Sequence, residues 1–231
     1  MQKTSEWNHQ QLTGLSQSHL TTLNINERNV LVHKDVVSAL LSLVTLAEKE
    51  GFKVAIASGY RDYERQRLIW NSKYLGLRPV LDSDGHILDA KSLSVEDRIH
   101  AILRWSALPG ASRHHWGCDF DLYAHNLLPS ESKLQLEPWE YLEGHQAPFY
   151  QWLLANTQQL GFFFPYSKDK GGVAIEPWHL SHQRTSSAAL KQLTQSILTE
   201  ALEQNPIEGS LEVLKHLDSI YTQYITNIST T

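Results

Sequence analysis

The apolar residues of this chain occur in short segments with two different spacings, and this pattern restricts the possible folds more than any other feature. Residues 36–44 carry apolar residues at helical intervals and are followed by Gly51, a typical helix stop. Residues 52–57 and 118–123 form short, strand-like segments, and apolar residues alternate with aspartates in the first part of the second segment. Because helical and strand-like segments interleave along the chain, we predict an α+β fold.

The same patterns predict where individual elements lie. We expect helices at residues 35–51, 62–74, 94–107, 147–160, 185–204 and 209–226. We expect strands at residues 52–57, 118–123, 162–164 and 173–175, and a surface loop or small hairpin at residues 78–93. Residues 1–30 are polar and weakly patterned, so we predict an N-terminal extension there that wraps the domain or frays, followed by one domain at residues 31–231.

Composition excludes several classes of protein. The chain has 231 residues, enough to bury a core without disulfides or a structural metal, and its single cysteine, Cys118, cannot form an internal disulfide. A formal net charge of −5 without a run of Lys or Arg argues against nucleic acid as a partner. The first residues lack a signal-peptide pattern, and no segment approaches the roughly 20 apolar residues that span a bilayer. We therefore expect a cytoplasmic monomer without a membrane span, or a periplasmic protein if the natural N-terminus is longer.

Two distant segments together carry the residues of a metal site. The first, residues 112–121, contains His114 and Asp121, and the second reads Glu176-Pro177-Trp178-His179. A catalytic zinc ion needs three protein ligands of the imidazole or carboxylate type and one open position for water. Zinc lowers the pKa of that water from about 15.7 toward 7, and a neighbouring glutamate can take its proton.

The spacing of the second segment differs from that of helical zinc motifs. Pro177 disfavours a helical conformation at Glu176, so we expect Glu176 and His179 to share a turn or an extended segment. Each histidine taken alone is more typical of a surface or structural position, and Asp119 with Asp121 could be a solvated strand face. The two segments taken together favour the metal site.

These residues resemble a known family, the metal-dependent D-alanyl-D-alanine carboxypeptidases and dipeptidases of the VanY/VanX type. The family pattern Ser-x-His-x-x-Gly-x-x-x-Asp, followed by Glu-x-x-His, is matched from Ser112 to Asp121 and from Glu176 to His179. The block Ser58-Gly59-Tyr60-Arg61, with Gln66 after it, also agrees. The three blocks follow the family's order and cover about residues 54–180.

The resemblance implies a fold and a set of roles. The fold would be Hedgehog/DD-peptidase-like, a single domain with a small, mostly antiparallel sheet flanked by helices. Zinc would be bound by His114, Asp121 and His179, with Glu176 as general base and later acid. Arg61 would act in catalysis by stabilising the oxyanion or would bind the substrate's terminal carboxylate, a group that guanidinium recognises well. The residues that would line the substrate pocket are Arg61, Gln66, Ser112 and Trp178.

Three positions depart from the family pattern. Arg113 stands where the family often has an acidic residue, and Asp119 where it often has a small one. On a strand, Asp119 and Asp121 point the same way, so Asp119 could support the metal site or be the ligand itself. His115 directly follows His114 and could compete with it. We favour Asp121 because its spacing from His114 fits the family.

The expected reaction is the hydrolysis of a C-terminal D-alanine from a peptidoglycan-type peptide by metal-activated water. An L,D-carboxypeptidase or a D-Ala-D-Ala dipeptidase on the same scaffold is the nearest alternative. An amidase or endolysin is a second, although no wall-binding repeat is present. A binding module that keeps zinc without catalysis is a third, against which Glu176 argues.

Overall fold

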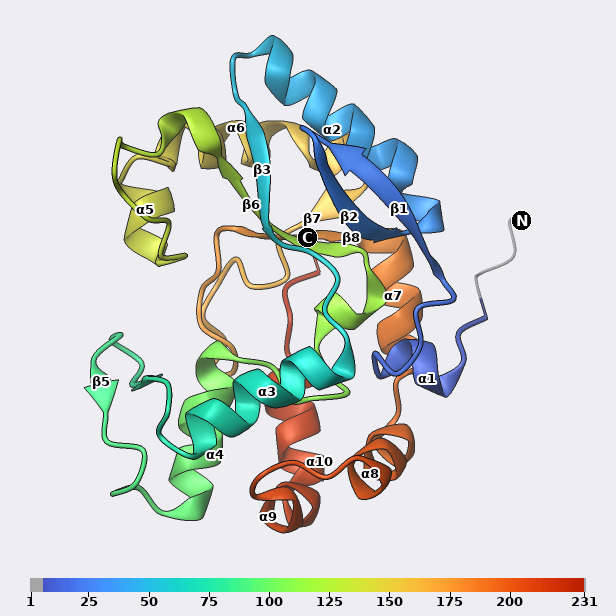
Figure 1. Cartoon of the computed structure of the whole chain (residues 1–231), viewed down its shortest axis with the longest axis vertical. Coiled ribbons are helices and arrows are strands. Elements are labelled where there is room, and N and C mark those ends of the chain that lie inside the picture. The colour runs from blue at the N-terminus through green and yellow to red at the C-terminus, as the bar shows by residue number, and fades with distance from the viewer. Residues whose placement is uncertain (1–5, 231) are drawn as a thin grey trace.

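A four-stranded antiparallel sheet lies at the centre of the computed structural model, which describes residues 6–230 (Figure 1). Its strand order is β3 (Val54–Ser58), β6 (Asp119–Ala124), β8 (His179–His182) and β7 (Phe162–Phe163). Two separate hairpins are formed by β1 (Leu20–Ile25) with β2 (Arg28–His33) and by β4 (Val80–Leu81) with β5 (Ile87–Leu88). The predicted α+β fold with a small antiparallel sheet flanked by helices is confirmed.

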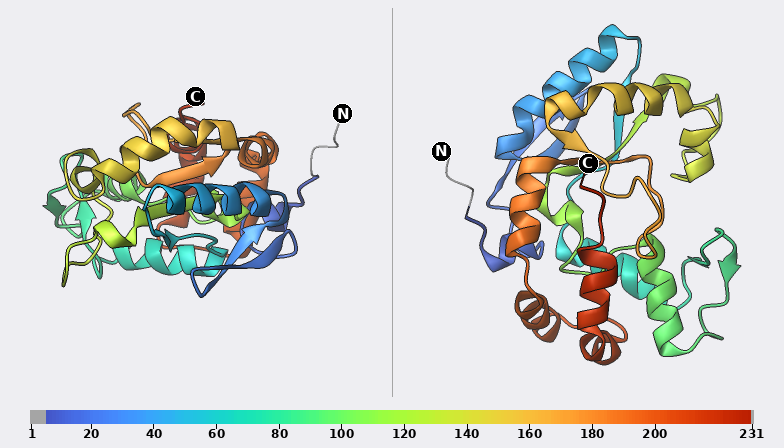
Figure 2. Two further views of the ribbon diagram at one scale, coloured as in Figure 1. Left: turned by 90° about the horizontal axis from the view of Figure 1, so that it is seen from above. Right: turned by 180° about the vertical axis from the view of Figure 1, so that it is seen from behind.

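Helices surround this sheet in two groups (Figure 1, Figure 2). One group shares the half of the molecule that holds the sheet, and its main members are α2 (Val37–Lys49) and α6 (Ala147–Asn156). The other half consists of α3 (Tyr63–Tyr74), α4 (Val95–Trp105), α8 (Gln195–Gln204), α9 (Ser210–Lys215) and α10 (Leu217–Ile220). The remaining helices are α1 (His9–Leu12), α5 (Pro138–Leu142) and α7 (Gln183–Gln192). Within residues 6–230, every helix is too short or too polar to cross a membrane.

The helix starts that the sequence predicts are made by local hydrogen bonds. The Asp62 side chain accepts from the backbone N–H of Arg65 at the start of α3, and Ser94 accepts from that of Asp97 at the start of α4. Such caps satisfy backbone donors that have no partner inside the helix. The helices predicted at residues 62–74 and 94–107 are therefore confirmed.

Three predictions in the C-terminal part of the chain are wrong in detail. The helix expected at residues 185–204 is split into α7 and α8, because the Thr194 side chain caps a new helix by accepting from the N–H of Ile197. The helix expected at residues 209–226 is likewise split into α9, α10 and a π-helical turn, Tyr221–Ile225. Residues 173–175 form no strand; instead Ala174 N–H bonds to the carbonyl of Arg104 near the end of α4.

The N-terminal segment is more regular than its sequence indicates. Beyond residues 1–5, which lie outside the described part of the chain, it contains α1 and the β1–β2 hairpin. Asn26 and Glu27 at the turn both have positive φ, 49° and 65°, as in the type I′ turns that favour tight hairpins. This hairpin runs across residue 30, and the division into an extension and a domain at that position stays a prediction.

Gly117, which follows the turn that carries His114, packs against the β1–β2 hairpin. Its φ is +66°, its carbonyl accepts from His33 N–H at 2.7 Å, and a Cβ there would lie 2.3 Å from the Leu20 side chain. Only glycine combines this backbone conformation with such close contact. The glycine at position 117 therefore has a packing reason: the hairpin holds the loop that carries His114.

A buried histidine beneath this hairpin is expected to make stability depend on pH. His19 is packed against Trp7 and His33, its Nε2 lies 3.1 Å from the carbonyl of His115, and burial lowers its pKa to about 4. The unfolded chain, with an ordinary histidine pKa near 6.5, takes up this proton first as the pH falls. Stability from His19 is therefore complete above about pH 6.5 and is lost progressively between about pH 6.5 and 4.

The measurement is urea unfolding at pH 7 and pH 5 for the wild-type protein and for His19→Gln, which keeps an N–H donor but cannot take up a proton. We expect the variant to lose about 1–2 kcal/mol less unfolding free energy over this interval than the wild type. An equal loss in the two proteins, prepared with the same metal content, would contradict the role given to His19.

Candidate metal centre

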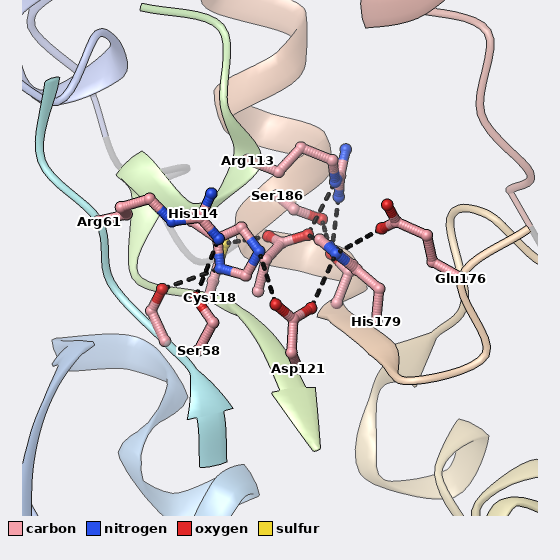
Figure 3. Close-up of polar contacts among 12 residues, drawn as sticks. Ser58, Arg61, Arg113, His114, Cys118, Asp121, Glu176, His179 and Ser186 are labelled. Carbon is pink, nitrogen blue, oxygen red and sulfur yellow. Dashed lines mark hydrogen bonds and ion pairs between the residues drawn. The ribbon is translucent and has the colours of Figure 1, made fainter. Parts of the chain in front are cut away.

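The three side chains predicted as metal ligands converge beside the two inner strands of the central sheet (Figure 3). His114 lies in the 3-10 turn η2 (Arg113–Trp116), Asp121 on β6 and His179 at the start of β8. Asp121 and His179 are directly opposite each other in the β6–β8 ladder, which places both side chains on the same face. One potential ligand atom from each of the three buried residues lies within 4.8 Å of the other two.

His114 presents a free nitrogen lone pair to this cluster. Its Nδ1 lies 2.8 Å from the carbonyl oxygen of Gly59, and because a carbonyl only accepts, Nδ1 carries the proton. Burial lowers the pKa of His114 to about 3, so the ring is neutral near pH 7. Its Nε2 lies 3.5 Å from Oδ2 of Asp121. A metal-binding imidazole needs this tautomer, held by a hydrogen bond at the far nitrogen.

His179 is held in the same way, by a carboxylate in place of a carbonyl. Its Nε2 lies 3.0 Å from Oδ1 of Asp119, and its Nδ1 lies 3.3 Å from Oδ1 of Asp121. Burial disfavours the charged ring, but contacts with three surrounding carboxylates outweigh burial and raise the pKa of His179 well above its usual value. The site therefore favours positive charge here, carried either by a proton on His179 or by a metal ion.

Asp119 contacts the nitrogen of His179 that is remote from Asp121, and it is not one of the clustered residues. Its Oδ1 accepts from Nε of Arg113 at 2.7 Å as well as from His179, and its Oδ2 accepts from the Cys118 thiol at 3.2 Å. Although burial opposes ionisation, Arg113 and His179 hold the pKa of Asp119 well below its usual range. The geometry thus favours Asp121 as the ligand and Asp119 as the carboxylate that orients His179.

The unsatisfied acceptor on Asp121 shows where a cation fits. Its Oδ1 is buried and lies 3.3 Å from Nδ1 of His179, but within residues 6–230 no donor meets it with hydrogen-bond geometry. A buried carboxylate is costly unless it is paired or coordinates a metal. Two imidazoles and one carboxylate around an open position form the donor set of a catalytic zinc site, so these residues fit zinc.

His115, the possible competitor of His114, is fully engaged elsewhere. Its Nδ1 lies 2.6 Å from the carbonyl oxygen of Arg61, and its Nε2 accepts from the backbone N–H of Gly110 at 3.1 Å. The side chain is completely buried. With both nitrogens bonded to the backbone, His115 ties the Arg61 loop to the His114 loop and has no lone pair left for a metal.

Glu176 reaches the cluster through a turn. The N–H of His179 donates to the carbonyl of Glu176 at 3.1 Å, which confirms the prediction that these two residues share a turn around Pro177. Oε2 of Glu176 lies 3.3 Å from Nδ1 of His179, and burial raises the pKa of Glu176 above that of an ordinary glutamate. A carboxyl group with a raised pKa beside the ligand set is suited to take up and return a proton.

Arg61 faces the site and is held from behind by Gln66. Its NH1 donates to Oε1 of Gln66 at 2.7 Å and its NH2 to Oγ of Ser58 at 2.9 Å. Gln66 is completely buried and donates through Nε2 to the carbonyl of Ala107 at 2.7 Å. The structure therefore brings Arg61 to the site but places Gln66 behind it, whereas the resemblance implied a place for Gln66 on the pocket wall.

A cleft of ≈ 1010 Å³ opens onto the cluster and contains the other predicted pocket residues. Ser112 lines it with a buried hydroxyl that has no hydrogen-bond partner among the described residues. Trp178 lines it with an indole that packs on Tyr141, at 5.8 Å between ring centroids. The cleft thus combines an apolar wall, a free hydroxyl and the guanidinium of Arg61 beside the ligand set.

Some residues of the site could not be identified from the sequence. Tyr166 lines the cleft with its ring 5.0 Å from that of His179, but a single aromatic residue in a loop has no spacing that marks it. The Arg113–Asp119 ion pair did leave a signal, since both positions depart from the family pattern, and reading the two departures as one compensating pair would have predicted it.

Comparison with known sequences identifies related proteins. The model of a family described as VanY, D-alanyl-D-alanine carboxypeptidase, matches residues 29–185. An uncharacterized protein of Haemophilus influenzae is 35% identical over 121 residues, which are 51% of this chain and 92% of that protein. The family match covers more than half of the chain and includes every residue of the metal-ligand cluster.

Comparison with solved structures identifies the same fold. The structure of VanYB in complex with D-alanine-D-alanine has a TM-score of 0.51 at 22% identity, covering 85% of this chain and 88% of that one. A D,D-pentapeptidase VanY mutant in complex with Zn(II) has a TM-score of 0.50 at 25% identity, covering 83% and 88%. These likenesses confirm the predicted fold.

Proposed function

The chain belongs to the VanY family of D-alanyl-D-alanine carboxypeptidases, and from this premise we propose that it is a zinc-dependent carboxypeptidase that releases the C-terminal D-alanine of peptidoglycan-type peptides. The observation that carries the proposal is the convergence of His114, Asp121 and His179, with Glu176 beside them, at the wall of an open cleft. The VanY mutant in complex with Zn(II) supports zinc as the metal.

His114, Asp121 and His179 would hold the ion, through Nε2, a carboxylate oxygen and Nδ1 respectively. When bound, zinc supplies a Lewis acid that polarises a carbonyl group and makes a water molecule more acidic. Asp119 would hold the proton of His179 on Nε2, and the Gly59 carbonyl that of His114 on Nδ1, which would leave the other nitrogen of each ring available to the ion.

Glu176 has the position and pKa of the proton-transfer group. Its carboxylate borders both the cluster and the cleft, so it can take a proton from the attacking water and deliver it to the leaving amine. A partly desolvated glutamate with a raised pKa is better matched to this task than an ordinary surface carboxylate. Contact with His179 opposes the effect of burial on the Glu176 pKa.

Arg61 supplies fixed positive charge on the opposite side of the cluster. Gln66 and Ser58 each accept one of its N–H groups, which orients the guanidinium while leaving other donors for a ligand. An arginine held in this way recognises a carboxylate or a developing oxyanion. Ser112 and Trp178 would complete the pocket for the terminal residue.

The test is the release of free D-alanine from synthetic muropeptides by the purified, zinc-loaded protein. Release from the pentapeptide alone would establish a D,D-carboxypeptidase, and release from the tetrapeptide alone would establish an L,D-carboxypeptidase. The dipeptide D-Ala-D-Ala as product would mean dipeptidase cleavage. No product from either peptide, with zinc still bound stoichiometrically, would overturn the proposal and favour a zinc-bearing binding module.

A further inference from the structure

Helix α3 presents a basic face to the far part of the same cleft. Arg65, Ile69 and Lys73 are spaced by four residues, so they lie on one side of the helix, and all three line the cleft. From Arg65 to Lys73 the helix advances about 12 Å. Beyond Lys73, the cleft wall continues with Arg78 and with residues of the β4–β5 hairpin. The cleft therefore extends well past the space that a single alanine occupies.

Lys73 is in an unfavourable place for a cation. Its only hydrogen-bond partner within residues 6–230 is Oγ of Ser106, at 2.7 Å, so two of its three N–H donors remain available. Burial, together with the positive charges of Arg78 and Arg61, outweighs the opposing effect of Glu176 and lowers the pKa of Lys73 to about 8. An ammonium group held beside other cations, with no carboxylate of the described residues in ion-pair contact, is stabilised by an anion that binds there.

Arg78 likewise has no ion-pair partner among the described residues, and its side chain is exposed at the cleft. Four carboxylates, those of Asp84, Asp121, Glu137 and Glu176, also line the cleft, but among the described residues none of them forms an ion pair with Lys73 or Arg78. The positive charge on this wall is therefore only partly offset inside the protein, by Glu176 at longer range.

We propose that Lys73 and Arg78 form a second anion subsite, which binds a side-chain carboxylate of the peptide substrate. The subsite rests on the proposed function, because its ligand is part of the same substrate. A carboxypeptidase has only one residue on the C-terminal side of the scissile bond, so an anion this far along α3 belongs to a residue on the N-terminal side. The substrate class is thus an acidic peptide with a carboxylate in addition to its terminal one.

The test compares pairs of acetylated peptides that differ in one group. Both members end in the D-alanine sequence that the wild-type protein hydrolyses, and one carries glutamate where the other carries glutamine. One pair has this change in the residue directly before the D-alanine sequence, and a second pair has it one residue earlier. We expect the zinc-loaded wild type to prefer the glutamate peptide by about tenfold in kcat/KM in one of the pairs.

Substitution identifies the source of this preference. In Lys73→Met and in Arg78→Gln we expect the ratio to fall toward one, whereas Arg67→Gln, on the same helix but paired with Glu64 outside the cleft, should keep it. Because each ratio is measured on one preparation, a partly unfolded variant does not change it. An unchanged ratio in Lys73→Met, or equal turnover of both peptides by the wild type, overturns the subsite alone. No D-alanine from any peptide overturns the proposed function and the subsite with it.

Discussion

Replacing Glu176 with glutamine is expected to reduce kcat for D-alanine release by about 10³-fold, within the range that general acid–base catalysis contributes. The substitution keeps the size of the side chain but removes the group that can accept a proton. Since Glu176 lies 3.3 Å from Nδ1 of His179 and is not one of the three clustered ligand residues, bound zinc should be retained. Steady-state kinetics on the reactive muropeptide and zinc analysis of the same sample give both quantities.

A matched control is available in the same cleft. Asp84 also lines the cleft, but it lies on the exposed β4–β5 hairpin, away from the ligand cluster. Asp84→Asn removes one negative charge from the cleft, as Glu176→Gln does, and we expect its kcat to stay within about threefold of wild type. A Glu176→Gln variant that keeps more than about a tenth of the wild-type kcat would show that another group transfers the proton.

The parts of the fold that could be predicted from the sequence are those set by local interactions. Asp62 and Ser94 mark the starts of α3 and α4 in the sequence, because a capping side chain bonds to a backbone N–H within four residues of it. The β1–β2 hairpin was missed for the opposite reason. Its turn, Asn26-Glu27, lacks the glycine that usually marks positive φ, and the hairpin is held by distant contacts such as that of His33 with Gly117.

In the candidate site, too, local sequence spacing predicted some features, whereas others depend on contacts between distant segments. Motif spacing predicted which residues would gather, and the structure brings His114, Asp121, His179 and Glu176 together. Strand alternation could not separate Asp119 from Asp121, because both point to the same face. Register separates them: Asp121 lies opposite His179 and Asp119 opposite Ser181, and register depends on a pairing between segments far apart in the chain. Lys73 belongs to no sequence motif, and only its position in the cleft of the folded protein indicates a role in binding.

The different places of the two aspartates predict a large difference in metal binding. Asp121→Asn removes the charged ligand itself, so we expect the purified variant to hold no stoichiometric zinc and to have no measurable activity. Asp119→Asn keeps an oxygen acceptor for Nε2 of His179 and weakens only the support of that ring, so its zinc affinity should fall by about 10–100-fold. Competition with a chromophoric zinc chelator measures both affinities on one scale.

Folding has to be measured beside these affinities, because the Asp119 carboxylate also neutralises Arg113. Both groups are buried, and loss of one member of such a pair costs about 3–5 kcal/mol when the other charge is left alone. We therefore expect Asp119→Asn to lower the free energy of unfolding more than Asp121→Asn does, while binding zinc more tightly. The reverse order of affinities, with zinc lost in Asp119→Asn and kept in Asp121→Asn, would make Asp119 the ligand. A carboxylate that orients a ligand and one that binds the metal are therefore distinguished by two measurements together: Asp119→Asn should be the less stable variant, and Asp121→Asn the weaker zinc binder.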